Sequence, residues 1–298
     1  GGEDGEEPDG TPDKYQRTVT YKVENGTWAD GSREAKQEVV TLLKDGEPSE
    51  NGSAALTAPA LGQADAGYTE GSWSPSVPGT IDGTEETLEY TYTYAARTDI
   101  AYKVVYYYDG ALGSKPSETA SEGGTGALGA EITVEAPGTA VVGEDNYVLV
   151  TENLTFTIQA EGNEFRIDYE KDNVGGGEDG EEPDGTPDKY QVKIHFKVLS
   201  GSFSENDDFD GLRTIVRTLT TDGKRAEDGT YQIAESDIPA IYPYDGFVTG
   251  TWDPELTAGT TVITGTAGDG IQEEWFLHTC KPGVGEFFNI TFQAGENG

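Results

Sequence analysis

The sequence has one cysteine, Cys280, and no methionine among its 298 residues. A single thiol cannot close a disulfide within the chain, and it does not assign the protein to a redox compartment. No run of about 18 apolar residues occurs, which excludes a membrane-spanning helix. Long stretches with the period of an amphipathic helix are also missing, because the best candidate, residues 53–66, is interrupted by Pro59 and Gly62.

Basic residues are scarce. The chain has 19 Lys and Arg against 56 Asp and Glu, which gives a formal net charge of −37. Binding to nucleic acid needs a surface rich in Lys and Arg, so we expect no nucleic-acid partner. An anionic membrane surface is disfavoured for the same reason. With only two histidines, a histidine-based metal site is not expected either.

The residues that are abundant favour β-structure. Tyrosine and threonine are frequent and apolar runs are short, which is typical of strands. The segment KYQRTVTYKVENG alternates with a period of two, and a related segment, KYQVKIHFKVLSG, lies 175 residues later. The expected inward-facing residues are Val19, Tyr21 and Val23 in the first segment and Val192, Ile194, Phe196 and Val198 in the second.

A sixteen-residue segment, GGEDGEEPDGTPDKYQ, opens the chain and returns unchanged at residues 176–191. Before its Lys-Tyr-Gln it has no apolar side chain larger than Pro. We therefore expect it to be a solvated, extended tether that packs against neither neighbour.

The likeness between the two halves continues beyond this segment. GYTEGSW at residues 67–73 corresponds to GFVTGTW at residues 246–252, with an offset of 179. This offset predicts four inserted residues, most simply within residues 204–211. Each half is expected to close on an alternating strand: TLEYTYTYA in the first, and EFFNITFQA, with Phe288, Ile290 and Phe292 on one face, in the second.

These patterns divide the chain into five parts. An acidic linker, residues 1–13, precedes a first β module, residues 14–98. A different, middle β module follows at residues 99–173, then an acidic Gly/Pro linker at 174–188 and a third module, related to the first, at 189–298. We expect a mostly β, monomeric protein with little helix. Gly1 is not a natural start, so we interpret the sequence as a piece of a longer protein.

The pattern DKYQ-x-x-V-x-YKV-x-NGTW-x-DG, followed by GYTEGSW and TYTYA, resembles the internalin-type B-repeats of Gram-positive surface proteins. This resemblance covers residues 14–96 and, less fully, residues 189–294. The middle module, with YKVVYYYDG, EITV and FRIDYEKD, resembles mucin-binding-protein-type (MucBP) repeats.

Both resemblances imply serial β-grasp-like (ubiquitin-like) modules in an extracellular, cell-wall-attached or secreted adhesin or stalk. They imply no catalytic residues and no cofactor. Host glycans or mucin-type glycoproteins are the partners that they suggest.

Four aromatic residues are candidates for ligand binding, because an exposed aromatic ring offers a flat face on which a pyranose ring can stack. They are Trp28, Tyr107, Trp73 and Trp252. The alternative interpretation is that the tryptophans are buried in the hydrophobic cores of small sheets. The recurrence of Trp73 as Trp252 in two related modules favours the core.

Two further motifs suggest ligands. Asn206, Asp208 and Asp210 fit positions 1, 3 and 5 of an EF-hand calcium loop, but Arg217 stands where the bidentate Glu is required, so an inserted, solvated loop is favoured. GTGALG at residues 124–129 spells a dinucleotide fingerprint, but a strand-like segment follows where that motif needs a helix, so a turn is favoured.

Catalytic pairs are weakly indicated. His278 and Cys280 would share one face of a strand, which makes a His-assisted thiolate conceivable, but a core-facing cysteine is the simpler interpretation. His195 alternates with Lys193 and Lys197 and is expected on the solvated outer face. Small modules in series offer little concavity for an active site, so we expect no enzymatic activity.

A covalent Lys–Asn cross-link, as in some stalk domains, is also disfavoured. Lys22, Lys193 and Lys197 are expected to point outward, and Asn289 alternates away from the apolar residues beside it. Two functions therefore remain: a spacer that holds a distal domain away from a cell wall, and a module that binds glycans or glycoproteins.

Overall fold

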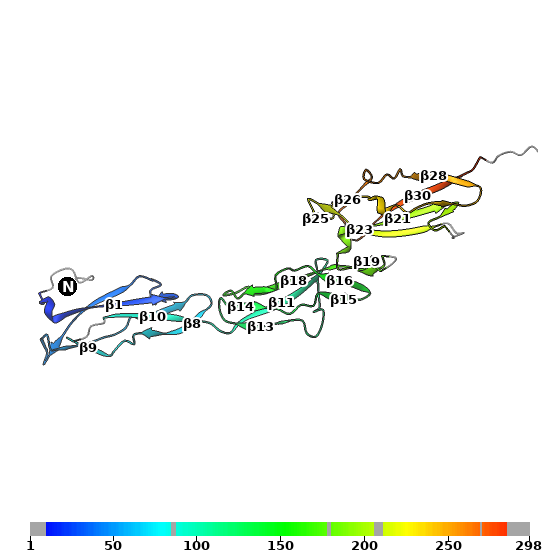
Figure 1. Ribbon diagram of the computed structural model, residues 1–298. Helices are drawn as coiled ribbons and strands as arrows, with labels where there is room; N and C mark the ends of the chain where they lie inside the picture. Colours follow the sequence, from blue (N-terminus) through cyan, green and yellow to red (C-terminus); the bar gives the residue numbers. More distant parts are fainter. Residues whose placement is uncertain (1–9, 85–87, 178–179, 206–210, 269, 285–298) are drawn as a thin grey trace, which may run out of the picture. The chain divides into compact units, whose positions relative to one another are not determined.

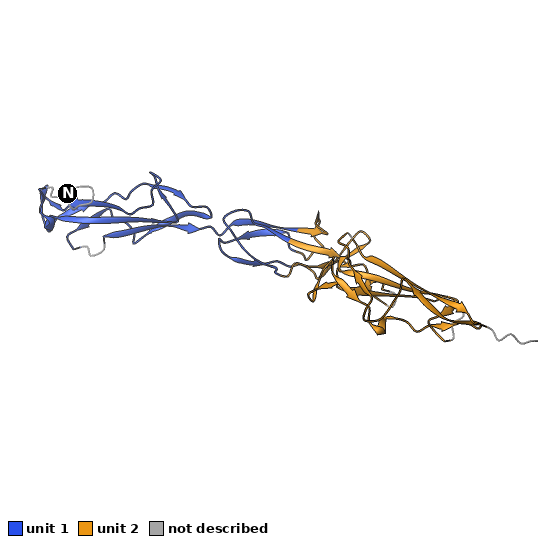
Figure 2. Cartoon of the chain, turned by 90° about the horizontal axis from the view of Figure 1, so that it is seen from above, with its two compact units in different colours: residues 1–105, 121–135, 153–166 blue, residues 106–120, 136–152, 167–298 orange. Residues whose placement is uncertain are grey.

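The computed structural model describes residues 10–84, 88–177, 180–205, 211–268 and 270–284. The chain forms two compact units, residues 1–105, 121–135 and 153–166 in unit 1 and residues 106–120, 136–152 and 167–298 in unit 2 (Figure 2). The described residues form strands, turns and three short 3-10 helices, with no α-helix among them (Figure 1). The prediction of a mostly β chain is confirmed. Within these ranges no helix is long and apolar enough to cross a membrane.

The first module, in unit 1, is built around a mixed sheet. Its strand order is β3-β1-β10-β8, and β1 and β10 are parallel neighbours at its centre. A smaller sheet, β5-β4-β6-β9, and the pair β2-β7 complete the module. The elements are η1 (Asp13–Tyr15), β1 (Gln16–Glu24), β2 (Gly26–Trp28), β3 (Lys36–Thr41), β4 (Leu43–Lys44), β5 (Glu47–Pro48), β6 (Ser53–Ala55), β7 (Leu61–Ala64), β8 (Tyr68–Ser74), β9 (Thr80–Asp82) and β10 (Glu89–Ala96).

The alternation of β1 predicted its burial correctly. Val19 and Tyr21 are almost fully buried, and Val23 packs against the same core. Strands β6 and β7 take up half of residues 53–66, the weak helix candidate, because Pro59 and Gly62 interrupt a helix and favour short extended pieces.

The middle segment contributes to both units, because its two longest strands, β11 and β18, pass from one unit to the other. In unit 1, β11 pairs with β13, and β14 pairs with β17. In unit 2, β11 pairs with β12, and β18 pairs with β16, which pairs with β15. The strands are β11 (Ile100–Tyr108), β12 (Ala111–Gly113), β13 (Gly123–Gly126), β14 (Glu131–Thr133), β15 (Thr139–Val142), β16 (Asp145–Leu149), β17 (Thr155–Thr157) and β18 (Glu164–Lys171).

Strands β11 and β18 run in the same direction. The Lys103 N–H donates to the Asn163 carbonyl in unit 1, and the Asp109 N–H donates to the Tyr169 carbonyl in unit 2. The partners are the same distance apart in sequence in both cases, which is the register of a parallel pair. The first and last strands of the middle module are therefore parallel neighbours, like β1 and β10.

The third module, in unit 2, repeats the topology of the first. Its main sheet has the order β23-β21-β30-β28, with β21 and β30 parallel. The elements of this part are β19 (Gly175–Gly176), β20 (Glu182–Pro183), η2 (Asp188–Tyr190), β21 (Gln191–Leu199), β22 (Gly201–Ser202), β23 (Leu212–Thr218), β24 (Thr220–Thr221), β25 (Lys224–Arg225), β26 (Thr230–Gln232), η3 (Glu235–Asp237), β27 (Tyr242–Pro243), β28 (Phe247–Asp253), β29 (Val262–Thr264) and β30 (Gln272–Pro282).

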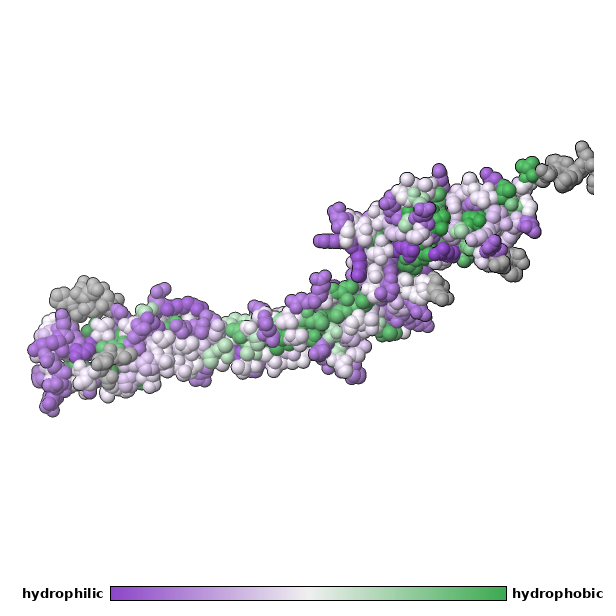
Figure 3. Space-filling view, viewed as in Figure 1, coloured by the Kyte–Doolittle hydropathy of each residue, from purple (hydrophilic) through white to green (hydrophobic). Residues whose placement is uncertain are grey.

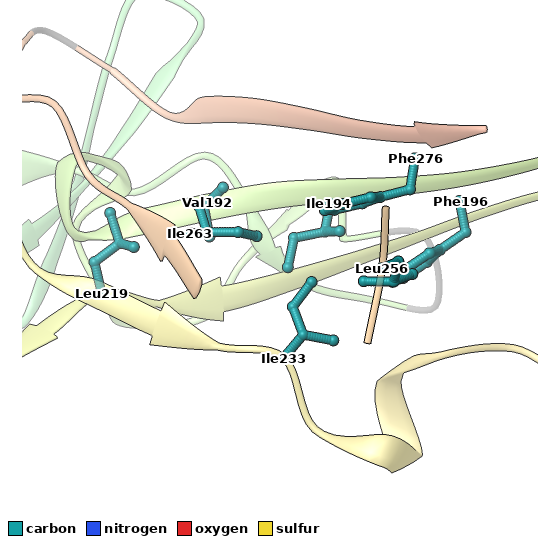
Figure 4. Packing of buried hydrophobic residues seen from close by; sticks show 8 residues of the cluster. All are labelled: Val192, Ile194, Phe196, Leu219, Ile233, Leu256, Ile263 and Phe276. Atoms are coloured by element: carbon teal, nitrogen blue, oxygen red, sulfur yellow. The ribbon is translucent and has the colours of Figure 1, made fainter. Parts of the chain in front are cut away.

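The core of the third module contains the inward-facing residues of β21 that the alternation predicted. Val192, Ile194 and Phe196 point toward side chains from β29, β30 and the connecting segments (Figure 4). The buried cluster consists of Val192, Ile194, Phe196, Leu219, Ile233, Leu256, Ile263 and Phe276.

The counterpart of β10 in the third module is not the segment that the sequence predicted. β30, residues 272–282, takes the place beside β21 that β10 takes beside β1: Phe276 lies opposite Phe196 as Tyr90 lies opposite Tyr21. The polar residues of this segment, which include His278, obscure its alternation. The segment EFFNITFQA, with Phe288, Ile290 and Phe292, lies outside the described residues.

The predicted position of the insertion also changes. Thr41 pairs with Gln16 and Thr218 pairs with Gln191, so the offset at β23 is only 177. The offset of 179 is reached by Trp252, which occupies on β28 the place of Trp73 on β8. Two of the four extra residues therefore precede β23, and the other two lie between β26 and β28. Strand pairing locates gaps that short sequence identities cannot.

The second copy of the sixteen-residue segment is folded over its described residues, 176–177 and 180–191. β19 and β20 form a small hairpin, and Gly180 and Pro187 are buried. A Cβ atom added to Gly180 would lie 2.8 Å from Cγ2 of Val216, so the hairpin packs closely on β23. The prediction of a tether that packs against neither neighbour is wrong for this copy. Glycines and short polar side chains allow close backbone approach without a large apolar residue.

Candidate functional site

Trp28 is a core residue. Its side chain is completely buried, and its indole Nε1–H donates a hydrogen bond of 2.9 Å to the Glu34 carbonyl. Its ring stacks on Trp73 with centroids 6.2 Å apart. A residue with no exposed surface cannot offer a platform to a ligand, so the ligand-binding prediction is wrong for Trp28.

The other aromatic candidates are distributed between the units. Trp252 is half-buried and packs edge-on against Phe196 and His278, with centroids 5.8 and 5.0 Å away. Tyr107 is half-buried on β11. Of the four candidates, the structure brings together only Trp28 and Trp73, and they meet as parts of one core.

Trp73 has a second surface, which lines an open groove of about 650 Å³ in unit 1. The groove is also lined by Tyr92, Glu70 and Ser72. At Gly71 the backbone approaches closely, because a Cβ there would lie within 1.8 Å of the Thr93 carbonyl. The groove therefore combines aromatic surface with polar groups, as small-molecule sites do.

The proposed ligand motifs find no support in the described geometry. Asn206, Asp208 and Asp210 lie outside the described residues. In the part of the chain that the structure describes, no three His, Cys, Asp or Glu side chains are grouped to hold a metal ion. The GTGALG segment is followed by strand β14 instead of the helix that binds phosphate in a dinucleotide site.

His278 and Cys280 share the inward face of β30, as expected, and each is 2% exposed. His278 Nε2 accepts a hydrogen bond of 3.2 Å from the Gly250 N–H, and burial lowers its pKa. Cys280 lies in the core beneath Gly201. The interpretation of Cys280 as a core-facing residue is confirmed.

The lysines of the proposed cross-link differ in environment. Lys22 and Lys197 are exposed, as predicted, and the Lys22 ammonium lies 2.7 Å from a Glu89 carboxylate oxygen. Lys193 is only 6% exposed, because the hairpin lies over it and Glu181 pairs with its ammonium at 2.6 Å. Lys193 stands on the outer face, as predicted, but the hairpin makes that position buried. Asn289 lies outside the described residues.

His195 was predicted to be solvated, and it is 8% exposed. The ring of Trp275 covers it, with centroids 4.0 Å apart and an interplanar angle of 19°. Its Nδ1 lies 2.9 Å from Thr214 Oγ1, and burial lowers its pKa. Trp275 is a functional candidate that was not predicted, although its alternation with Phe276 places it on the outer face of β30.

The second sixteen-residue copy takes part in a joint, which we define as residues 170–191. The Asp188 carboxylate accepts hydrogen bonds from the Asn173 and Val174 N–H groups, at 2.9 and 3.2 Å. Reciprocally, the Asp172 carboxylate accepts from the N–H groups of Asp184 and Gly185, at 3.1 and 2.8 Å. Burial raises the pKa of both carboxyl groups.

Lys189 completes the joint. Its ammonium lies 2.6 Å from Glu170 and 3.1 Å from Glu227. The identical residues of the first copy have other surroundings: Asp13 is exposed, and Lys14 meets Glu50 at 3.3 Å with both side chains 57% exposed. At the second copy, the end of the middle module supplies the N–H groups that the buried Asp188 carboxylate accepts from.

Comparison with known proteins does not assign the chain to a family. No family model matches the chain, and no curated protein matches it. Among solved structures, the pilus adhesin SpaC from Lactobacillus rhamnosus GG aligns with 14% sequence identity and a TM-score of 0.17. The alignment covers 90% of this chain and 44% of the adhesin, so the chain spans less than half of the adhesin's length. A TM-score this low does not establish a shared fold.

Proposed function

We propose that this chain is a non-enzymatic, extracellular spacer in the stalk of a bacterial surface adhesin, built from β-grasp-like modules. The observation that carries this proposal is the parallel pairing of the first strand of a module with its last described strand. β1 pairs with β10 and β21 pairs with β30, and β11 and β18 are parallel neighbours.

This pairing is suited to tension. A module in a stalk is pulled through the start of its first strand and the end of its last strand. When these strands are parallel neighbours, the pull acts along them and loads their backbone hydrogen bonds together in shear. When a pull acts at the same end of both strands, the hydrogen bonds break one after another.

The surface and the joint agree with a spacer role. Hydrophilic residues cover much of the visible face, and apolar residues form only small patches on it (Figure 3). A net charge of −37 keeps such a chain soluble and separate from its neighbours. The reciprocal carboxylate contacts of Asp172 and Asp188 hold a fixed chain path between the middle module and β21.

Single-molecule pulling on the first module tests the proposal. The pulling direction is set by a pair of introduced cysteines. Asp13→Cys with Ala96→Cys pulls at opposite ends of β1 and β10, and Asp13→Cys with Glu89→Cys pulls at the same end of both strands. All three positions are exposed, and both pairs are made with Cys280→Ala so that no other thiol reacts. We expect the 13–96 pair to need a severalfold higher unfolding force than the 13–89 pair.

Equal unfolding forces in the two directions would remove the mechanical basis of the spacer proposal. Urea unfolding without force controls for stability, since the two doubly substituted chains should have the same midpoint.

The groove at Trp73 favours a second candidate function, the binding of host glycans or mucin-type glycoproteins. The groove places Trp73 beside Glu70 and Ser72, which offers an aromatic surface and hydrogen-bonding groups to a sugar. Ser76 is exposed at its edge, so Ser76→Arg should block it without disturbing the core.

If the groove binds glycans, Ser76→Arg will abolish binding to immobilised mucin-type O-glycopeptides. The matched control is Ser236→Arg, which introduces the same charge at an exposed serine of the third module. Unchanged binding by the Ser76→Arg chain, or no binding by the unmodified chain, would eliminate the groove as a glycan site.

A further inference from the structure

The outer face of the third module presents a flat aromatic surface. Trp275 is 49% exposed and lies on β30 directly beside His195 on β21. The two rings are nearly parallel, with centroids 4.0 Å apart and an interplanar angle of 19°. One face of the indole therefore covers the imidazole, and its opposite face is the surface open to solvent.

The platform is held in place before any ligand arrives. His195, the ring beneath it, is 8% exposed, and its Nδ1 lies 2.9 Å from Thr214 Oγ1. Both rings stand on the two central strands of the sheet, which pair in parallel register. A ring fixed by packing loses little side-chain entropy on binding, which favours recognition.

Hydrogen-bonding groups border the platform. Glu273 lies two residues before Trp275 on the same face of β30, and its side chain is 53% exposed. Its Oε2 lies 3.7 Å from His195 Nε2, a buried atom with no hydrogen-bond partner among the described residues. Lys197, two residues after His195, is exposed on the same face.

The fold itself does not require this arrangement, because the first module lacks it. The row Gln37, Thr20 and Glu89 of the first module occupies the positions of Thr214, His195 and Trp275 in the third. There, Glu89 forms a surface ion pair with Lys22. The stacked pair Trp275 and His195 therefore distinguishes the third module from the first.

We propose that the exposed face of Trp275 is a binding platform for neutral glycans. The apolar face of a pyranose ring stacks on the indole, and its hydroxyl groups form hydrogen bonds with the Glu273 carboxylate and the Lys197 ammonium. A net charge of −37 opposes sialylated or sulfated sugars, which selects neutral ones. This inference is independent of the spacer function and of the groove at Trp73.

The test uses the full chain and an array of oligosaccharides that end in galactose, glucose or N-acetylglucosamine, with sialylated and sulfated forms as the anionic arm. We expect saturable binding to neutral sugars and a change in tryptophan fluorescence. Trp275→Ala should weaken the binding at least about tenfold, which corresponds to about 1.4 kcal/mol. Trp275→Phe should retain part of it.

The matched control is Val262→Ser, which removes another exposed apolar side chain, 51% exposed, from β29 of the same module. It should leave sugar binding unchanged. Three outcomes would overturn the proposal: no binding to any neutral sugar, binding confined to anionic sugars, or concentration-dependent self-association in sedimentation that Trp275→Ala abolishes. The last outcome would identify the exposed face of Trp275 as a protein contact.

Discussion

Trp28→Ala is expected to lower the free energy of unfolding of the first module by about 3–5 kcal/mol. The indole is fully buried, packs on Trp73 and satisfies its N–H through the Glu34 carbonyl. Its removal leaves a cavity that this small core has few residues to fill. Because whole domains are stable by only about 5–15 kcal/mol, this loss is a large fraction of the module's stability, and its unfolding midpoint should fall by more than about 10 °C.

Thermal unfolding followed by near-UV circular dichroism and by hydrogen exchange of β1 and β10 checks this result. The control is Trp275→Ala, which removes the same side chain from a half-exposed position and should change stability by less than about 1 kcal/mol. If Trp28→Ala left the first module folded with an unchanged midpoint, the assignment of Trp28 to the core would be wrong.

The second large effect is expected from Asp188→Ala. This change removes the acceptor of two backbone N–H groups, those of Asn173 and Val174, at a buried site. An unsatisfied buried donor costs about 1–3 kcal/mol, so we expect a loss of about 2–4 kcal/mol in the stability of the joint. Hydrogen exchange of these two amides should accelerate accordingly.

The chain supplies a control within an identical sequence. Asp13→Ala changes the corresponding residue of the first copy, which is exposed, and should change stability by less than about 0.5 kcal/mol. Equal effects of Asp13→Ala and Asp188→Ala would mean that the second copy, like the first, behaves as a solvated tether.

The same site gives the joint a dependence on pH. Burial raises the pKa of Asp188, and the nearby Asp172 carboxylate raises it further, against the hydrogen bonds from Asn173 and Val174 and the charge of Lys171. An acid whose pKa is higher in the folded than in the unfolded chain stabilises the folded state at low pH. This stabilisation is complete below the unfolded-state pKa of about 3.9 and is lost as the pH rises through the folded-state pKa. The joint should therefore be more stable near pH 4 than at pH 7.

Asp188→Asn separates the two contributions. The amide oxygen can still accept from both N–H groups, while the buried charge is gone. We expect the variant to match the parent chain at pH 4, to exceed it in stability at pH 7, and to retain only the smaller pH dependence that Asp172 contributes. A joint that became less stable on acidification would contradict the direction of both shifts.

The alternation of β1 and β21 could be read from the sequence, because one face of each strand is apolar at every second position and must be buried. The equivalence of Trp73 and Trp252 followed from the repeated Gly and Trp. The closing strand of the third module could not be found this way. In β30 the buried face includes His278 and the exposed face includes Trp275, so the usual polarity is partly reversed.

The candidate site was the least predictable part. Residue type alone indicates four aromatic residues as ligand-binding candidates, but the exposure of a ring depends on what packs over it. Trp28 and Trp73 meet because β2 and β8 belong to one module, and Trp275 stays exposed because no described strand crosses its outer surface. The burial of Lys193 and His195 on β21 could not be predicted, because alternation marks their face as solvated. In the structure the hairpin covers Lys193 and the indole of Trp275 covers His195.

The sequence by itself determined that the chain is built from strands, that the first and third modules are related, and which face of β1 and β21 packs on the hydrophobic core. These properties depend on local alternation and on repeated motifs. The tertiary structure decided which strands are parallel neighbours, which aromatic rings remain exposed, and that identical residues form an exposed segment at Asp13 and a buried joint at Asp188. The physical reason is that burial and hydrogen bonding depend on residues distant in sequence, and here the end of the middle module supplies the N–H groups that turn an acidic tether into a joint.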